Sequence, residues 1–159
     1  MIIAGLGFRN GCTAADLVAV VRLAESHTGL RAAALAAPQF KADHPALHEA
    51  AAVLSLPLLL VDDAALQAAQ PRCPTRSAAA QRATGLASVA EAAALSTPGS
   101  HLLQPRLTHG PATCALATQS PLPLLSGEGR GEGVLPSDAQ SARPARTTSC
   151  FEAAAPTLP

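Results

Sequence analysis

Aromatic residues and lysine are scarce in this chain of 159 residues. It has no Trp, no Tyr, three Phe and a single lysine, Lys41. Proteins that bind single-stranded nucleic acids stack the bases on aromatic side chains, and nucleic-acid binding in general needs a basic surface. Eleven basic residues balance eleven acidic ones, and no basic run occurs. We therefore expect no nucleic-acid partner.

Long apolar runs and paired cysteines are missing as well. No stretch reaches the roughly 18 apolar residues of a membrane-spanning helix, and the N-terminus lacks the pattern of a signal peptide. The cysteines Cys12, Cys73, Cys114 and Cys150 form no CxxC pair, so a zinc site is not expected. We expect a cytoplasmic protein with no membrane contact, disulfide, metal or cofactor.

The residues that are present predict one packed α/β domain. Ala, Leu and Val supply most of the 48% hydrophobic content. Expected strands are 2–4, 30–37, 56–61, 101–107 and 112–117. Expected helices are 13–27, 43–54, 62–69 and 88–95. Alternation of strands and helices is typical of a layered α/β fold. The tight turn between the last two strands makes them antiparallel, so the sheet is mixed.

The domain is expected to cover residues 1–118. Beyond it, residues 119–159 are rich in Pro, Gly and Ser, a composition that cannot bury enough apolar surface to fold. We expect a low-complexity, disordered tail there. Within the domain, residues 70–83 are expected to be a loop over a site or over the surface.

Two short patterns have the form of a helix-capping box. Thr13 and Asp16 form one, and Ser88 and Glu91 form the other. In such a box the hydroxyl binds the backbone three residues on, and the carboxylate binds back to the cap residue. Ser88 and Glu91 fit this structural role better than a catalytic pair.

A glycine-rich segment separates the first expected strand from the first helix. It contains Gly5, Gly7, Arg9 and Gly11. A glycine turn there exposes backbone N–H groups next to a helix N-terminus, which suits an anion, and Arg9 adds a grip on a carboxylate. The alternative is a tight turn that serves only sheet packing. The spacing fits neither a dinucleotide fingerprint nor a P-loop.

Three further positions could take part in chemistry. Lys41 and His44 follow the second strand, at the edge where open α/β sheets bind ligands. Lys41 is equally well explained as a surface lysine. His44 and His48 share a helix face, but the sequence between them is not a zinc-binding HExxH motif. Cys114 lies in an apolar strand and is expected to be a buried, inert thiol.

Five motifs in order carry a family resemblance. They are G-x-G-x-R-x-G at 5–11, Lys41 to Leu47, L-x-L-P at 54–57, G-x-x-S-V-x-E-A-A-A-L at 85–95 and T-C-A-x-A at 113–117. With this order and spacing the chain resembles the CobE family and the C-terminal domain of CbiG proteins, over residues 1–118.

The resemblance implies a three-layer α/β/α domain with a mixed, mostly parallel sheet of about five strands. It implies a role in cobalamin biosynthesis, with a carboxylate-rich corrin precursor as ligand and other enzymes of the pathway as further partners. Glycine turns, helix N-termini and basic side chains all suit carboxylates. The expected ligand-binding residues are Gly5, Gly7, Arg9, Gly11, Lys41, Gly85, Ser88, Glu91 and Thr113.

Three functions follow from this resemblance. The first is binding or carriage of the corrin precursor. The second is catalysis, because whole CbiG proteins resemble a hydrolase that opens a ring lactone; Glu91 or His44 would then be the general base and Lys41 would polarise a carbonyl. The third is a non-catalytic partner domain that organises a pathway complex, for which an exposed apolar patch would be the sign.

Overall fold

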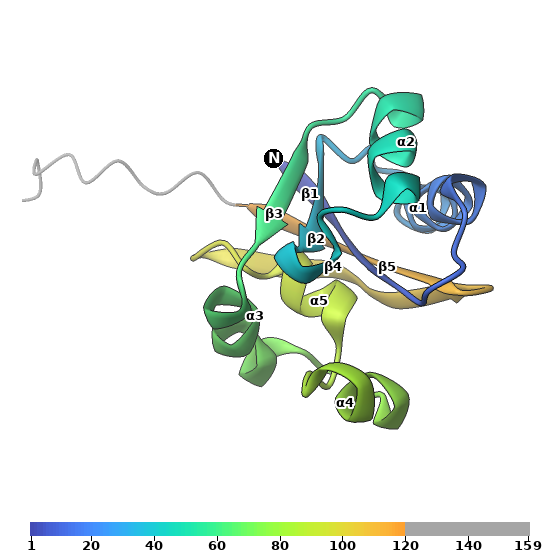
Figure 1. The fold of residues 1–159 in the computed structure, drawn as a ribbon. Coiled ribbons are helices and arrows are strands. Elements are labelled where there is room, and N and C mark those ends of the chain that lie inside the picture. Colours follow the sequence, from blue (N-terminus) through green and yellow to red (C-terminus); the bar gives the residue numbers. More distant parts are fainter. Residues whose placement is uncertain (120–159) are drawn as a thin grey trace, which may run out of the picture. The chain divides into compact units, whose positions relative to one another are not determined.

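A computed structural model describes residues 1–119, and its centre is one five-stranded sheet (Figure 1). The strands are β1 (Ile2–Phe8), β2 (Ala34–Pro38), β3 (Leu58–Val61), β4 (Ser100–His109) and β5 (Ala112–Gln119). Their order in the sheet is β3-β2-β1-β5-β4. β1, β2 and β3 pair in parallel, whereas β5 runs antiparallel to β1 and β4. The predicted mixed sheet is confirmed.

Helices cover both faces of this sheet, which confirms the three layers (Figure 1). They are α1 (Ala14–Thr28), α2 (Pro45–Leu54), α3 (Asp63–Ala69), α4 (Ala78–Thr84) and α5 (Val89–Ala94), with short 3₁₀ turns at Gln39–Lys41 and Gln70–Arg72. α1 and α2 pack on one face, and α3 and α5 pack on the other. The chain therefore changes faces after β3.

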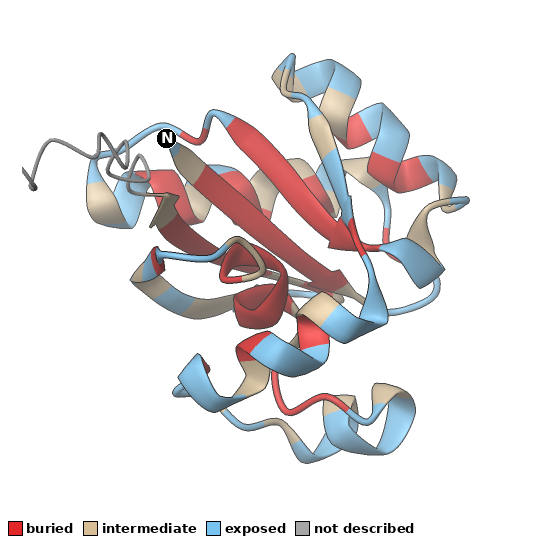
Figure 2. Cartoon of the chain, turned by 90° about the vertical axis from the view of Figure 1, so that its left-hand side faces the viewer, coloured by how far each residue is buried: buried red, intermediate tan, exposed pale blue. Residues whose placement is uncertain are grey.

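The core has two apolar clusters, one on each side of the sheet. Ala4 and Leu6 of β1 point to the cluster under α1 and α2, whereas Ile3 points to the cluster under α3 and α5. This alternation is the ordinary period of a strand. Figure 2 shows the central strands buried and the outer surfaces of the helices exposed. Both faces of β1 are thus covered.

Gly5 and Gly7 lie inside β1, so the glycine turn predicted after residue 4 is wrong. A Cβ on Gly5 would lie 2.1 Å from the carbonyl oxygen of Ala90, and one on Gly7 would lie 3.3 Å from the amide nitrogen of Ala90. The alanine-rich helix α5 therefore rests directly on the backbone of β1. Gly5 and Gly7 therefore fit the alternative that these glycines serve only the packing of the sheet, because any side chain at Gly5 would collide with α5.

The first predicted capping box is present at the start of α1. Thr13 Oγ1 accepts a hydrogen bond from the amide of Asp16 at 3.2 Å, and the carboxylate of Asp16 accepts one from the amide of Thr13 at 2.9 Å. The hydrogen bonds that the carboxylate accepts from the amide and the hydroxyl of Thr13 lower the pKa of Asp16 below its usual value, and His109 lowers it further. α1 begins at Ala14 for this reason.

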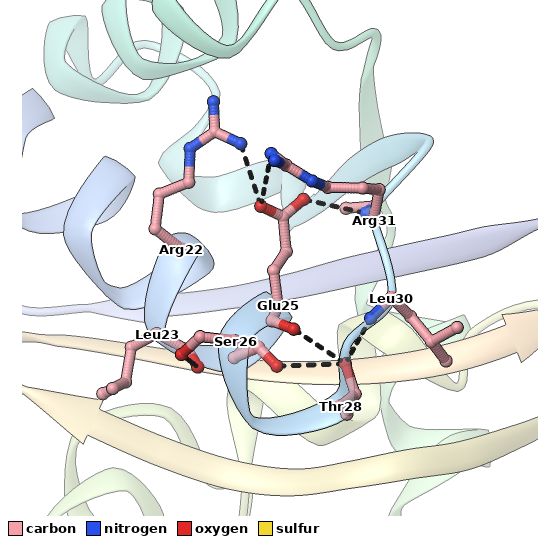
Figure 3. Close-up of polar contacts among 9 residues, drawn as sticks. Arg22, Leu23, Glu25, Ser26, Thr28, Leu30 and Arg31 are labelled. Atoms are coloured by element: carbon pink, nitrogen blue, oxygen red, sulfur yellow. Dashed lines mark hydrogen bonds and ion pairs between the residues drawn. The ribbon is translucent and has the colours of Figure 1, made fainter.

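A second polar cluster ties the end of α1 to the segment that enters β2 (Figure 3). The buried carboxylate of Glu25 accepts a 2.9 Å hydrogen bond from the amide of Ala32 and pairs with Arg22 at 2.9 Å and Arg31 at 3.5 Å. The Arg22 side chain is about half exposed and that of Arg31 is largely exposed, so water weakens the ion pairs. The bond to Ala32 is the part that fixes the chain.

Residues 70–83 and the segment from 119 onward were predicted to lie outside helices and strands. Residues 70–83 are not only a loop, because α4 begins within them. The Ser77 side chain accepts a hydrogen bond from the amide of Ala80, and Gly85 ends the helix with φ 74°. The tail predicted from 119 onward lies outside the described residues, apart from Gln119, which ends β5.

Among the described residues, no helix combines the length and the apolar character that crossing a membrane would require.

Candidate functional site

A cleft of about 740 Å³ opens at the carboxyl ends of β1 and β2. Its lining residues come from the ends of β1 and β2, from α4, from the start of α5 and from the β4–β5 hairpin. They include Arg9, Lys41, Ala80, Ala83, Arg106 and Thr113. Strands β2 and β3 lie on one side of β1 in the sheet, and β5 and β4 lie on its other side, so the strand order switches direction at β1. Open α/β sheets bind ligands at this point.

The charged side chains that line this cleft are all basic. They are Arg9 after β1, Lys41 after β2 and Arg106 on β4, and no carboxylate of residues 1–119 lines it. Lys41 Nζ donates a 2.7 Å hydrogen bond to Oδ1 of Asn10 and lies 5.4 Å from the ring centroid of Phe8. The cleft therefore has a positive potential that suits an anionic ligand.

His44 does not line the cleft, but it packs against Phe8, which does. Its ring packs against the ring of Phe8 in a T-shaped arrangement, with a centroid distance of 5.0 Å. Its Nδ1 is buried and has no hydrogen-bond partner in the part of the chain that the structure describes. His44 thus supports Phe8, which in turn lies beneath Lys41.

Glu91 is fully buried within α5, outside the cleft. Its carboxylate accepts hydrogen bonds from the amide of Thr75 at 3.1 Å, from the Thr75 hydroxyl at 2.6 Å and from the amide of Arg106 at 2.9 Å. The second predicted capping box is therefore wrong, because the Glu91 carboxylate reaches other segments instead of Ser88. The buried Ser88 hydroxyl caps nothing and has no partner within residues 1–119.

The structure brings together four of the nine predicted ligand-binding residues. Gly7, Arg9, Lys41 and Thr113 line the cleft. The Thr113 hydroxyl donates a 2.8 Å hydrogen bond to the carbonyl of Gly7. Those that do not line it are Gly5, Gly11, Gly85, Ser88 and Glu91.

Sequence reasoning missed several lining residues. Arg106, Asn10 and Thr108 line the cleft, as do the exposed ring of Phe40 and the small side chains of α4. Phe40 directly precedes Lys41, so proximity to a predicted residue could have flagged it. Arg106 had no such signal, because its place depends on an irregularity in β4.

Two cysteines of the described residues, Cys73 and Cys114, are buried thiols with a raised pKa. Burial raises the pKa of the Cys114 thiol to about 12, and Glu25 adds to this. Burial raises that of Cys73 to about 11, with a further contribution from Glu91. The prediction of a buried Cys114 is confirmed. In residues 1–119 no three His, Cys, Asp or Glu side chains gather as metal ligands would.

Comparison with known proteins places this chain in a family. The family model described as "Cobalamin synthesis G C-terminus" matches residues 2–117. The chain belongs to this family. Like other members of the cobalamin synthesis G C-terminus family, it is a protein of cobalamin biosynthesis. The resemblance seen in the sequence is thereby confirmed.

Two solved structures resemble this family member. One is CobE, a protein from the cobalamin (vitamin B12) biosynthetic pathway, with 36% identity and a TM-score of 0.70, covering 76% of this chain and 91% of that one. The other is cobalamin biosynthesis protein chiG from Agrobacterium tumefaciens str. C58, with 34% identity, a TM-score of 0.62 and coverage of 76% and 100%. No curated protein matches the chain.

Proposed function

We propose that this protein binds a corrin precursor through its carboxylate arms, in the cleft at the ends of β1 and β2. The observation that carries the proposal is the set of lining charges: Arg9, Lys41 and Arg106 are basic, and no acidic side chain of the described chain opposes them. Corrin precursors are flat rings fringed with acetate and propionate groups. Arginine and lysine bind such carboxylates by charge-assisted hydrogen bonds.

The rest of the lining suits the body of such a ligand. Phe40, Val89, Ala80 and Ala83 supply an apolar surface along the cleft. Small-molecule sites are mostly apolar, with a few polar groups that orient the ligand, and they enclose roughly 300–1,000 Å³. The volume of about 740 Å³ lies in this range. An open cleft would hold one side of a large macrocycle and leave the other side accessible to a partner enzyme.

The position of Glu91 favours binding over catalysis. A general base must reach the proton that it removes, but the Glu91 carboxylate is fully buried and already accepts three hydrogen bonds. His44 does not line the cleft either, which leaves Lys41 as the one catalytic candidate within it. A lysine without a neighbouring base fits the binding of a carboxylate better than the opening of a lactone.

The test compares two corrin probes that share the same ring and have either charged or esterified, neutral arms. Cobyrinic acid has free carboxylate arms, and its methyl ester has the same ring with neutral arms. We expect calorimetric titration to show binding of the acid at micromolar concentration, weaker binding at higher salt and no measurable binding of the ester. Absence of binding at high micromolar concentration, or equal binding of the acid and the ester, would overturn the proposal.

A further inference from the structure

We propose that Arg106 forms a carboxylate subsite in the cleft and that Glu91 is the residue that positions it. This inference rests on the proposed function and deepens it, because it assigns one arm of the acidic ligand to one guanidinium. Glu91 itself does not touch the ligand. It acts through the backbone of β4.

An irregularity in β4 creates the need for such a residue. The pairing of β4 with β5 shifts register between Leu102 and Gln104 and again between Gln104 and Leu107. A bulge of this kind leaves backbone groups without a partner in the ladder. Pro105 has no N–H to offer, and the N–H of Arg106 donates to Glu91 Oε1 at 2.9 Å. Glu91 therefore takes the place of the missing strand partner.

The same carboxylate also holds a second part of the cleft. It accepts the amide and the hydroxyl of Thr75, two residues before Ser77 caps α4. Ala79, Ala80 and Ala83 of α4 line the cleft, as does Arg106. One buried group on the rigid sheet-packed helix α5 thus fixes both the bulge of β4 and the approach to α4.

The guanidinium of Arg106 is left available by this arrangement. Glu91 bonds its backbone, and ion pairs within residues 1–119 occur only at Glu25. The Nε of Arg106 is buried and has no hydrogen-bond partner in the same part of the chain. A buried donor without a partner is unfavourable. A ligand carboxylate that binds Nε and a terminal nitrogen together would satisfy it in the usual forked geometry.

The first test measures the affinity for cobyrinic acid in variants of Arg106. We expect Arg106→Ala to raise the Kd about tenfold or more and Arg106→Lys to recover only part of the loss, because lysine cannot form the fork. Both variants keep the backbone N–H that Glu91 binds, so they are expected to fold. Arg82→Ala is the matched control, since this exposed arginine of α4 does not line the cleft. Its Kd should stay unchanged.

The second test asks whether Glu91 acts through Arg106. Glu91→Gln should raise the Kd several-fold in the native background and add little in the Arg106→Ala background, because a positioning residue has no effect once its target is gone. Amide hydrogen exchange at Arg106 should accelerate in Glu91→Gln even without ligand. If Glu91→Gln does not fold, Glu91→Asp replaces it in this test, because it keeps the charge and moves the carboxylate oxygens away from the amides of Arg106 and Thr75.

The outcomes separate this inference from the proposed function. If cobyrinic acid still binds more tightly than its ester but Arg106→Ala has the native Kd, the subsite is wrong and the proposed function stands. If the losses from Glu91→Gln and Arg106→Ala add independently, the positioning role is wrong. If native protein does not bind cobyrinic acid, the function and the subsite both fall.

Discussion

Lys41 Nζ donates a 2.7 Å hydrogen bond to Oδ1 of Asn10, which joins the segments that follow β2 and β1 at the cleft. The ammonium group also lies 5.4 Å from the ring centroid of Phe8. These contacts hold the only lysine of the chain at the cleft, where the pair still contacts solvent. The charge of Lys41 is therefore preorganised for an anion, which favours affinity.

The first prediction concerns this lysine. Lys41→Met removes the charge and keeps most of the side-chain volume, so we expect the Kd for cobyrinic acid to rise about tenfold. Asn10→Ala keeps the charge of Lys41 and removes only the hydrogen bond that orients it, so the Kd should rise less than in Lys41→Met. Because the hydrogen bond between Lys41 and Asn10 contacts solvent, the free energy of unfolding should change by about 1 kcal/mol or less in either variant. A native Kd in Lys41→Met would contradict the role of the lysine.

The second prediction concerns the contact between β1 and α5. Gly5→Ala would place a Cβ 2.1 Å from the carbonyl oxygen of Ala90 and 2.4 Å from the amide nitrogen of Ala94. Since backbone cannot move as a side chain can, we expect a loss of about 3 kcal/mol or more in the free energy of unfolding. Gly11→Ala is the control, because its φ is +89° but it has nothing within 4 Å. Denaturant unfolding should show that Gly11→Ala lowers the free energy of unfolding by only about 1 kcal/mol.

The third prediction concerns the pH dependence of the cap on α1. Hydrogen bonds from Thr13 hold the pKa of Asp16 below its usual 3.8 in the folded protein. A carboxyl with a lowered folded pKa stabilises the fold fully above its unfolded pKa, and this contribution disappears as the pH falls through the folded pKa. The difference in unfolding free energy between native protein and Asp16→Asn should thus shrink from about pH 5 toward pH 2.

A companion variant tests the other half of this cap. Thr13→Ala should lose about 0.5–2 kcal/mol at neutral pH. A constant difference between native protein and Asp16→Asn across the acid range would contradict the lowered pKa of Asp16.

The fourth prediction concerns the thiols. With pKa values raised to about 12 for Cys114 and about 11 for Cys73, neither forms the thiolate that alkylating agents attack at neutral pH. In a Cys150→Ser background, iodoacetamide at about pH 8 should modify both residues only after denaturation. Rapid modification of Cys114 in the native protein, read by mass spectrometry, would contradict its burial.

The elements of this fold follow closely from local patterns in the sequence. Thr13 and Asp16 mark the start of α1, Asp62 caps α3 through the amide of Ala65, and the turn at Gly110 joins β4 to β5. Each of these signals depends on neighbours a few residues apart. The small alanine side chains of α5 allow it to pack closely on Gly5 of β1.

The site was harder to predict because its residues depend on contacts across the chain. Ser88 and Glu91 have the same spacing as Thr13 and Asp16, but Glu91 binds partners 16 and 15 residues away. Gly5 has the pattern of a turn until the position of α5 is known. Arg106 reaches the cleft from a bulge that no local pattern marks. Lys41 was found because open α/β sheets bind ligands at the carboxyl ends of their strands. Arg9 was found because it lies in the glycine-rich segment, where it could bind a carboxylate.

A crystal structure of the protein with cobyrinic acid tests the central claim most directly. We expect the corrin to occupy the cleft beside β1, with carboxylate oxygens within hydrogen-bond distance of Arg9, Lys41 and Arg106. A corrin bound elsewhere on the protein, or one that meets the cleft without contact between its carboxylates and these three side chains, would contradict it.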